Sequence, residues 1–246
     1  MNSTCKVCEK SFEYEPLKEI LDVKLSDLRP SICSSQCESR IKEELQREVS
    51  KNVFYRILNV MPECYKGVNM SDFSEMTLKS SIRQEVFKGA DELIQRFCNS
   101  DYWNISLFSP VYGNGKTRLG LYILACLALK GVYKMREITS IQDTGYYSAI
   151  DICKLLRTES FDSKQFYQKR FYNSRALMID DLGQEPENQA VEISGILKVR
   201  EENKRKTIIT SNLTKDQLEK RYTGRVYSRL AKGAFLVEGN DRRIEK

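Results

Sequence analysis

Short apolar segments alternate with longer helical ones over the second half of the chain. The expected strands are Trp103–Phe108, Tyr146–Ile150, Ala176–Ile179 and Thr207–Thr210. The expected helices are Arg83–Cys98, Leu119–Leu129, Ile150–Leu156 and Val191–Arg200, and Tyr146–Ile150 is alternatively the lead-in to the third of these. This alternation predicts an α/β fold in which crossover helices flank a parallel sheet.

The first 78 residues show a different pattern. From Ser39 to about Ile57, apolar residues recur at helical spacing with charges between them, which predicts an amphipathic helix. The following stretch, near residues 61–77, contains Pro62, Gly67 and several Ser and Asn residues, as expected of an irregular linker. We therefore predict a small module over residues 1–42, a helix and linker over 43–78, and the main domain over 79–246.

Four of the eight cysteines form two close pairs near the N-terminus, Cys5 with Cys8 and Cys33 with Cys37. Two such pairs can close a tetrahedron of thiolates around Zn²⁺. Zinc binding can replace the core that ~40 residues cannot build, so a structural zinc site is favoured over coincidental or redox thiols. Four cysteine ligands leave no open position for a catalytic water, which predicts a recognition or assembly role.

The composition excludes several classes of protein. With 41% apolar and 30% charged residues, the chain resembles a soluble globular protein, and no apolar run approaches the roughly 20 residues that cross a bilayer. The N-terminus lacks the basic-then-apolar pattern of a secretion signal, so a cytoplasmic location is expected. Histidine is absent, which excludes an imidazole base and any His ligand to zinc.

Positive charge gathers in the last fifth of the chain. The net charge is +6, and from Lys198 to Lys246 the 14 basic residues exceed the 7 acidic ones by 7. This excess suits a polyanion such as nucleic acid, although a solvated basic face is the alternative. A second basic stretch, Lys164–Tyr172, interleaves cations with aromatic rings, as single-stranded DNA binders do. Its rings are alternatively half-buried helix contacts.

Residues 110–117 read Pro-Val-Tyr-Gly-Asn-Gly-Lys-Thr and lie between an expected strand and an apolar helix. In a P-loop, backbone N–H groups exposed by glycines surround the phosphates, while Lys reaches the β/γ oxygens and Ser/Thr holds Mg²⁺. The candidate nucleotide-binding residues are Gly113, Asn114, Gly115, Lys116, Thr117 and Arg118. The full pattern has glycine where this chain has Pro110, and an ordinary glycine turn is the alternative. The flanking strand and helix favour a P-loop that binds ATP.

Two carboxylates, Asp180 and Asp181, follow the expected strand Ala176–Ile179. A strand that ends in this way delivers both groups to the edge where α/β sheets place their ligands. Asp180 is expected to hold Mg²⁺ together with Thr117, and Asp181 to orient or deprotonate the attacking water. The alternative is a strand that simply ends in a turn.

The segment Leu177–Glu185, Leu-Met-Ile-Asp-Asp-Leu-Gly-Gln-Glu, resembles the Walker B segment of the DnaC/DnaI-type helicase loaders and of their relative, the IstB transposition helper. The resemblance covers roughly residues 58–246 and implies the AAA+ fold, with ATP and Mg²⁺ as ligands. Residues 210–214, Thr-Ser-Asn-Leu-Thr, are similar to the sensor 1 segment of these proteins. The resemblance implies that Asn212, with Ser211 as the less favoured candidate, contacts the attacking water or the γ-phosphate.

Residues 224–230, Gly-Arg-Val-Tyr-Ser-Arg-Leu, are similar to the segment that carries the arginine finger of the family. The resemblance implies that Arg229 reaches the γ-phosphate of a neighbouring subunit, supported by Arg225. Residues 239–243 resemble the sensor 2 segment, with Arg243 preferred over Arg242. An arginine supplied by a neighbour makes hydrolysis conditional on assembly, so self-association is expected. Without the resemblance, these arginines would be interpreted as solvated basic residues.

The favoured hypothesis is an AAA+ P-loop NTPase with a parallel sheet flanked by helices, a four-cysteine zinc-binding module and a helical linker. It would load a hexameric replicative helicase onto single-stranded DNA, with the zinc module and helix docking on the helicase. One alternative is an IstB-like transposition helper on duplex DNA. Another is a non-hydrolysing nucleotide-dependent adaptor, motivated by Pro110 and Asp181. Among possible origins, a phage or another mobile element is favoured over a bacterial chromosome.

Overall fold

The computed structural model describes residues 2–4, 11–13, 73–80, 85–100, 102–135, 144–158 and 160–241. The chain divides into two compact units, Met1–Asn52 and Val53–Lys246. In the first unit, β1 (Asn2–Thr4) pairs antiparallel with β2 (Ser11–Glu13). All the other described elements belong to the second unit.

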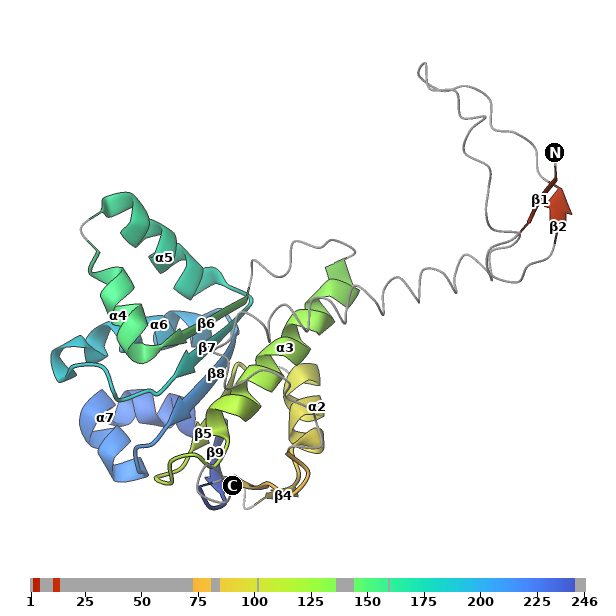
Figure 1. Cartoon of the computed structure of the whole chain (residues 1–246). Helices are drawn as coiled ribbons and strands as arrows, with labels where there is room; N and C mark the ends of the chain where they lie inside the picture. The colour runs from red at the N-terminus through yellow and green to blue at the C-terminus, as the bar shows by residue number, and fades with distance from the viewer. Residues whose placement is uncertain are drawn as a thin grey trace. The chain divides into compact units, whose positions relative to one another are not determined.

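Within the described residues, a seven-stranded sheet forms the centre of the second unit (Figure 1). Its strands are β3 (Thr77–Ser80), β4 (Val86–Lys88), β5 (Asn104–Phe108), β6 (Thr144–Ser148), β7 (Ala176–Asp180), β8 (Lys206–Ser211) and β9 (Ala234–Glu238). Their order is β4-β3-β9-β5-β8-β7-β6. The strands from β9 to β6 are parallel, whereas β3 pairs antiparallel with β4 and β9. The carboxyl ends of the parallel strands therefore meet at one edge of the sheet.

Helices lie on both faces of this sheet (Figure 1). They are α2 (Asp91–Asn99), α3 (Lys116–Met135), α4 (Ala149–Leu156), α5 (Phe161–Asn173), α6 (Ala190–Glu202) and α7 (Lys215–Ala231), with the short 3-10 helix η5 (Glu187–Gln189) before α6. Helix α3 covers one face with α2 beside it, and α4 to α7 gather on the other, each packed on the next. Parallel strands require such crossover connections because each strand must begin again at the same edge.

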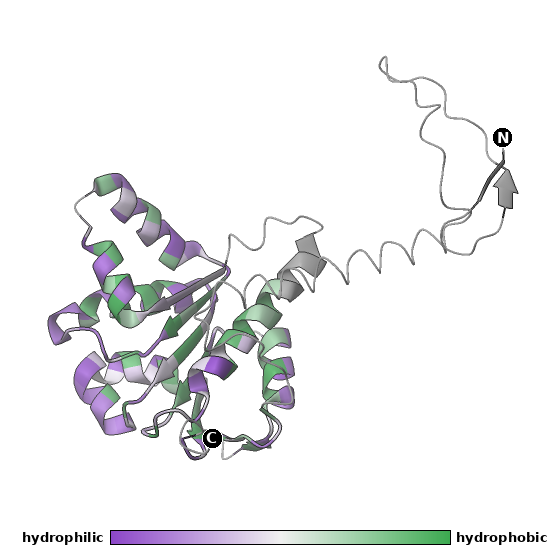
Figure 2. Cartoon of the chain, in the orientation of Figure 1, coloured by the Kyte–Doolittle hydropathy of each residue, from purple (hydrophilic) through white to green (hydrophobic). Residues whose placement is uncertain are grey.

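The central strands are buried along almost their whole length. Every residue of β5 and β7 is buried, and so is every residue of β8 after the first. Figure 2 shows these strands as the hydrophobic centre of the domain and α5 and α7 as largely hydrophilic. A strand covered by helices on both faces needs a continuous apolar run, which is why the sequence predicts these strands clearly.

The charged side chain of Arg200, on α6, is fully buried in this core. Its Nη1 donates hydrogen bonds to the carbonyl oxygens of Phe171 at 2.8 Å and Ser174 at 3.0 Å, and its Nη2 to that of Lys206 at 2.7 Å. Its Nε donates to the hydroxyl of Thr207 at 2.8 Å. Arg200 therefore joins α6 to the end of α5 and the start of β8 and satisfies carbonyl groups that would otherwise be buried without partners.

The predicted helix Arg83–Cys98 is wrong over its first part. Residues Val86–Lys88 form β4, and α2 begins only at Asp91. Between them Gly89 has a φ of 80°, and its N–H donates to the carbonyl of Met76 at 2.7 Å. The apolar residue Phe87 therefore belongs to a strand that pairs with β3, not to a helical face.

The other predicted elements that fall on described residues are confirmed with changes in their ends, whereas the predicted helix from Ser39 to about Ile57 lies outside the described residues. The strands β1, β2, β3 and β9 and the helix α7 were not predicted. The segment from Tyr146 divides at Ser148, which ends β6 and caps α4 by accepting a hydrogen bond from the N–H of Asp151 at 3.1 Å. The strands β3 and β9, which lie between β4 and β5 in the sheet, are only partly buried.

The sheet includes residues on both sides of position 78, because β3 spans Thr77–Ser80. Most of the predicted module at 1–42 and of the predicted helix and linker at 43–78 lies outside the described residues. The described helices include none with the length and apolar character required to span a bilayer.

Candidate nucleotide-binding site

The glycine-rich loop connects the carboxyl end of β5 to the first residue of α3. Gly113 and Gly115 adopt φ angles of 68° and 93°, which residues with a Cβ rarely adopt. Asn114 holds the loop to the neighbouring strand, because its Nδ2 donates to the carbonyl of Val237 on β9 at 3.0 Å. The first turn of α3 carries no acidic residue, so its free N–H groups keep their attraction for anions.

Lys116, the first residue of α3, directs its ammonium group into the curve of the loop. Its Nζ donates to the carbonyl of Val111 at 2.7 Å and to Oδ1 of Asn114 at 3.0 Å, and the residue is only 6% exposed. The loop thus combines glycine amides with a cation that points at its centre. This is the combination that phosphate groups require.

Asp180, the last residue of β7, is 4% exposed and accepts hydrogen bonds from three hydroxyl groups. Thr117 donates to its Oδ1 at 3.0 Å, Tyr146 donates to its Oδ2 at 3.1 Å, and Thr210 also donates to its Oδ1. The donor set of Thr117 and Asp180 consists of oxygen atoms, which fits Mg²⁺. Tyr146 and Thr210 were not predicted, because their strands reach Asp180 only in the folded sheet.

A glycine allows α3 to pack closely on the strand that carries these acids. A Cβ at Gly120 would lie 2.6 Å from Cε of Met178 on β7 and 3.3 Å from a methyl of Ile208 on β8. A larger residue would require the side chain of Met178 or the helix itself to shift. The close packing of Gly120 therefore helps to hold Thr117 within hydrogen-bonding distance of Asp180.

Asp181 follows the end of β7 in a left-handed conformation, with φ of 53°. Its N–H donates to the hydroxyl of Thr210 at 3.0 Å, and Nδ2 of Asn212 donates to its Oδ1 at 3.3 Å. Burial, followed by the charge of Asp180, raises the pKa of Asp181, while the ammonium of Lys116 opposes this shift. A carboxylate with a raised pKa is a stronger base.

Of the two sensor 1 candidates, Asn212 lies beside the acids and Ser211 does not. Ser211 is fully buried, and its hydroxyl donates to the carbonyl of Leu182 at 2.6 Å while it accepts from the N–H of Leu213 at 3.1 Å. Ser211 ends β8, and its hydroxyl is used to hold the turn after β7. The structure therefore leaves Asn212 as the polar side chain next to Asp181.

Glu185 organises the same turn and was not predicted as a site residue. Its side chain is fully buried and accepts hydrogen bonds from the N–H of Gly183 at 2.9 Å, Nε of Arg221 at 3.2 Å and the hydroxyl of Tyr222. Burial, followed by the charge of Glu185, raises the pKa of Tyr222, so this hydroxyl stays protonated and donates. Glu185 thus connects the turn after Asp181 to α7.

Arg221, Arg225 and Arg229 follow one another at four-residue intervals and so share one side of α7. Nε of Arg229 lies 2.6 Å from Oε2 of Glu201 at the end of α6. Arg225 is exposed. Arg118, on α3, is partly buried near the P-loop end of that helix. Both sensor 2 candidates, Arg242 and Arg243, lie outside the described residues.

The basic and aromatic stretch Lys164–Tyr172 lies within α5, and its rings divide between two environments. Phe171 is fully buried and lies edge to face with Tyr147, with centroids 5.0 Å apart. Phe166, in contrast, is 59% exposed, and Phe161 at the start of the helix is 74% exposed. The interpretation as helix contacts is therefore confirmed for Phe171, whereas the exposed ring of Phe166 leaves DNA binding a prediction.

The predicted zinc ligands, Cys5, Cys8, Cys33 and Cys37, lie outside the described residues. In sequence, the first pair falls between β1 and β2, two strands that pair as a hairpin. Among the described residues, no cluster of three or more His, Cys, Asp or Glu side chains could hold a metal ion. The described cysteines, Cys98, Cys126 and Cys153, are free thiols.

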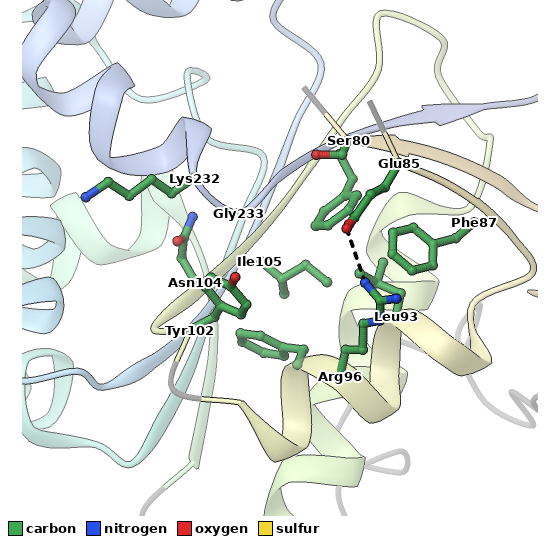
Figure 3. A pocket seen from close by; sticks show the side chains of 12 residues that line it. Ser80, Glu85, Phe87, Leu93, Arg96, Tyr102, Asn104, Ile105, Lys232 and Gly233 are labelled. Carbon is green, nitrogen blue, oxygen red and sulfur yellow. Dashed lines mark hydrogen bonds and ion pairs between the residues drawn. The ribbon is translucent and has the colours of Figure 1, made fainter. Parts of the chain in front are cut away.

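A small apolar cavity at the other end of β5 does not belong to this site (Figure 3). It has a volume of about 40 Å³ and is lined by Phe87, Leu93 and Ile105. At its rim, Nη1 of Arg96 and Oε1 of Glu85 lie 3.4 Å apart. The cavity brings together none of the predicted site residues.

No protein-family profile matches the sequence, and no curated protein matches it either. The structure is similar to that of the DnaC helicase loader, with 22% identity, a TM-score of 0.53, and coverage of 72% of this chain and 100% of that one. It is also similar to the structure of DnaI, with 20% identity and a TM-score of 0.54; the match covers 74% of this chain and 94% of DnaI. A third similar structure is that of a putative primosome component from Streptococcus pyogenes serotype M3, with 20% identity and a TM-score of 0.51. That match covers 74% of this chain and 92% of the other. The second unit therefore shares its fold with these solved structures, as the sequence resemblance predicts.

Proposed function

We propose that this chain is an ATPase that loads a replicative helicase onto single-stranded DNA. The observation that carries the proposal is the meeting of three segments at one edge of the sheet. Thr117 lies 3.0 Å from Asp180 although 63 residues separate them, and Asn212 lies 3.3 Å from Asp181 across 31 residues. A phosphate-binding loop, a pair of acids and a polar sensor side chain are the parts that phosphoryl transfer to water requires.

ATP binding would use the amides of the glycine-rich loop together with the ammonium of Lys116. Thr117 and Asp180 would hold Mg²⁺, which supplies positive charge beside the phosphates. Arg118 would add a further cation at the start of α3. Pro110, which replaces the first glycine of the usual pattern, lies before this set of groups and removes none of them.

Asp181 would act on the attacking water, oriented by Asn212. The raised pKa of Asp181 favours proton removal from water, and its amide contact with Thr210 fixes the direction of the carboxylate. Asp181 takes the position that glutamate often occupies in ATPases of this class. Its shorter side chain requires the water to lie closer to β7.

Full activity would require a neighbouring subunit. Arg229, supported by Arg225, would stabilise the charge that develops on the γ-phosphate of the neighbour, and Arg243 would contact the nucleotide of its own subunit. Both Arg225 and Arg229 lie on α7, which Glu185 connects to the turn after Asp181. Assembly and hydrolysis would thereby be coupled.

Single-stranded DNA would bind along α5 and the basic C-terminal region. The exposed ring of Phe166 offers a surface on which a base can stack, and the lysines of the same helix offer phosphate contacts. The four-cysteine module would bind Zn²⁺ and, with the following helix, dock on the helicase in the cytoplasm. The solved structure named as a DnaC helicase loader supports the choice of partner.

The central test measures ATP turnover by the purified full-length chain, with and without single-stranded DNA. Asp181→Asn should reduce turnover by about 10²–10⁴-fold, the usual contribution of a general base. Asp216→Asn, at an exposed position of α7, is the matched control and should leave turnover unchanged. Equal turnover in both variants would refute the role of Asp181. No turnover in the wild-type chain would favour the non-hydrolysing adaptor.

Subunit cooperation can be tested by mixing two inactive variants. Lys116→Ala destroys the nucleotide site but keeps the arginines, whereas Arg229→Ala does the reverse. Their mixture should regain part of the activity, because one subunit then completes the site of the other. A mixture as inactive as its components would exclude Arg229 from action between subunits.

Co-purification with a hexameric replicative helicase tests the partner. Cys5→Ser and Cys33→Ser should abolish the complex and the bound zinc while ATP binding persists, and Cys98→Ser is the matched control. If the chain binds duplex DNA and transposase instead of a helicase, the IstB-like alternative holds.

A further inference from the structure

A polar hollow of about 300 Å³ opens at the edge of the sheet where β7 and β8 begin. Arg175, Lys204 and Arg205 line it, together with the polar residues Asn99, Ser100 and Asn203. Asp180 and Asn212 lie at the opposite ends of the same two strands. The hollow is therefore separate from the candidate nucleotide-binding site.

Arg175, Lys204 and Arg205 have no acidic partner in the part of the chain that the structure describes. The acids closest to them in sequence are engaged elsewhere, since Glu201 pairs with Arg229 at 2.6 Å and Glu202 with Lys198 at 3.9 Å. Nη1 of Arg175 is buried and has no hydrogen-bond partner among the described residues. A buried donor of this kind is costly unless a ligand or water satisfies it.

Lys206 also lines the hollow, and Arg200 lies behind it. Nζ of Lys206 donates to the carbonyls of Phe97, Ser100 and Tyr102, at 2.7, 2.6 and 2.7 Å, so its donors are already used within the protein. Behind the hollow, burial and then the charge of Arg205 lower the pKa of Arg200 to about 9. An anion bound near Arg205 would relieve this repulsion.

The turn that carries two of the cations is held in place before any ligand binds. Lys204 has a φ of 50°, and its N–H donates to the carbonyl of Glu201 at 3.0 Å. The N–H of Arg205 donates to the carbonyl of Arg200 at 2.8 Å. Binding at a preformed turn loses less conformational entropy than binding to a flexible one.

We propose that this hollow binds a phosphate group, held by Arg175, Lys204 and Arg205. The two guanidinium groups offer forked donors that match the oxygens of a phosphate, and the ammonium adds a third positive charge. A free phosphate and a phosphate of a nucleic-acid backbone share this chemistry. The site goes beyond the proposed function, because neither ATP hydrolysis nor helicase binding requires it.

The experiment titrates inorganic phosphate into the full-length chain by calorimetry, with ADP and Mg²⁺ in excess to occupy the P-loop. Arg175→Gln and Arg205→Gln should each weaken phosphate binding at least about tenfold, as expected for loss of a charged hydrogen bond. Lys198→Gln removes the same charge from an exposed site outside the hollow and should leave the affinity unchanged. Lys204 is also exposed, so Lys204→Gln serves as a third variant if an arginine variant does not fold.

A second arm measures binding of an oligothymidylate at several salt concentrations. If a backbone phosphate occupies the hollow, each substitution there should lower the slope of log affinity against log salt by about 0.7 for every phosphate that the variant no longer binds. An unchanged slope with weaker phosphate binding assigns the site to a free phosphate. The inference is wrong if neither phosphate affinity nor slope differs between the hollow variants and Lys198→Gln. ATP turnover should be normal in all of them, so failure here is distinguishable from failure of the proposed ATPase.

Discussion

The carboxylate of Glu185 is expected to stabilise the domain by several kcal/mol, because it is fully buried and accepts three hydrogen bonds. Glu185→Ala would leave the guanidinium of Arg221, whose side chain is only 15% exposed, without its main partner. Breaking one side of a buried ion pair costs about 3–5 kcal/mol. Since Arg221 keeps some contact with water, we expect the lower end, about 3 kcal/mol. For a domain of this size, that decrease corresponds to a melting temperature lower by roughly 6–12 °C.

Denaturant unfolding of the wild type and variants measures this cost. The matched control is Glu187→Ala, because Glu187 approaches Arg221 only to 4.0 Å and its side chain is 92% exposed. Exposed pairs contribute little, so the control should change the free energy of unfolding by less than about 1 kcal/mol. Adding Arg221→Met to Glu185→Ala should recover part of the stability, because no unpaired charge then remains. If Glu185→Ala and Glu187→Ala lower the free energy of unfolding by the same amount, the buried contacts of Glu185 do not stabilise the fold.

Three further changes test other parts of the structure. Because the pKa of Asp181 is raised in the fold, its ionisation costs stability as pH rises; Asp181→Asn should therefore unfold at higher denaturant than the wild type at pH about 7, with a smaller gain at pH about 4. A stability lower than that of the wild type at neutral pH would contradict this. Gly120→Ala should destabilise the domain by about 1–3 kcal/mol in denaturant unfolding, because the added Cβ meets Met178, and a neutral result would show that Met178 moves freely. Phe166→Ala should preserve stability and weaken single-stranded DNA binding by about 1–3 kcal/mol in a fluorescence titration, whereas unchanged affinity would remove this ring from the DNA surface.

The strands predicted most clearly from sequence are those whose burial is almost complete. β7 and β8 are covered by helices on both faces, so their residues had to form continuous apolar runs. In contrast, β3 and β9 pair at the side of the sheet where burial is partial, and their short patterns resemble loops. β4 was assigned to a helix because a three-residue strand carries too little periodicity to separate the two.

The chemical groups of the candidate site were predicted from local motifs, but their partners were not. Lys116, Thr117 and Asp180 are marked by spacing within short segments, which the sequence displays directly. Tyr146 and Thr210 contact Asp180 only because β6 and β8 lie on either side of β7. The position of Glu185 within the Walker B-like segment could have marked it as a site residue. Nothing local, however, indicated that Arg221 would pair with it.

The sequence by itself determined the buried strands β5, β7 and β8, the phosphate-binding loop, and the acids at the carboxyl end of β7, because each depends on residues close together in the chain. The tertiary structure decided which groups meet: the three hydroxyls around Asp180, the connection from Glu185 to α7, and the cations at the amino ends of β7 and β8. These contacts depend on which strands become neighbours in the sheet. That choice comes from packing between distant segments, which no local pattern records.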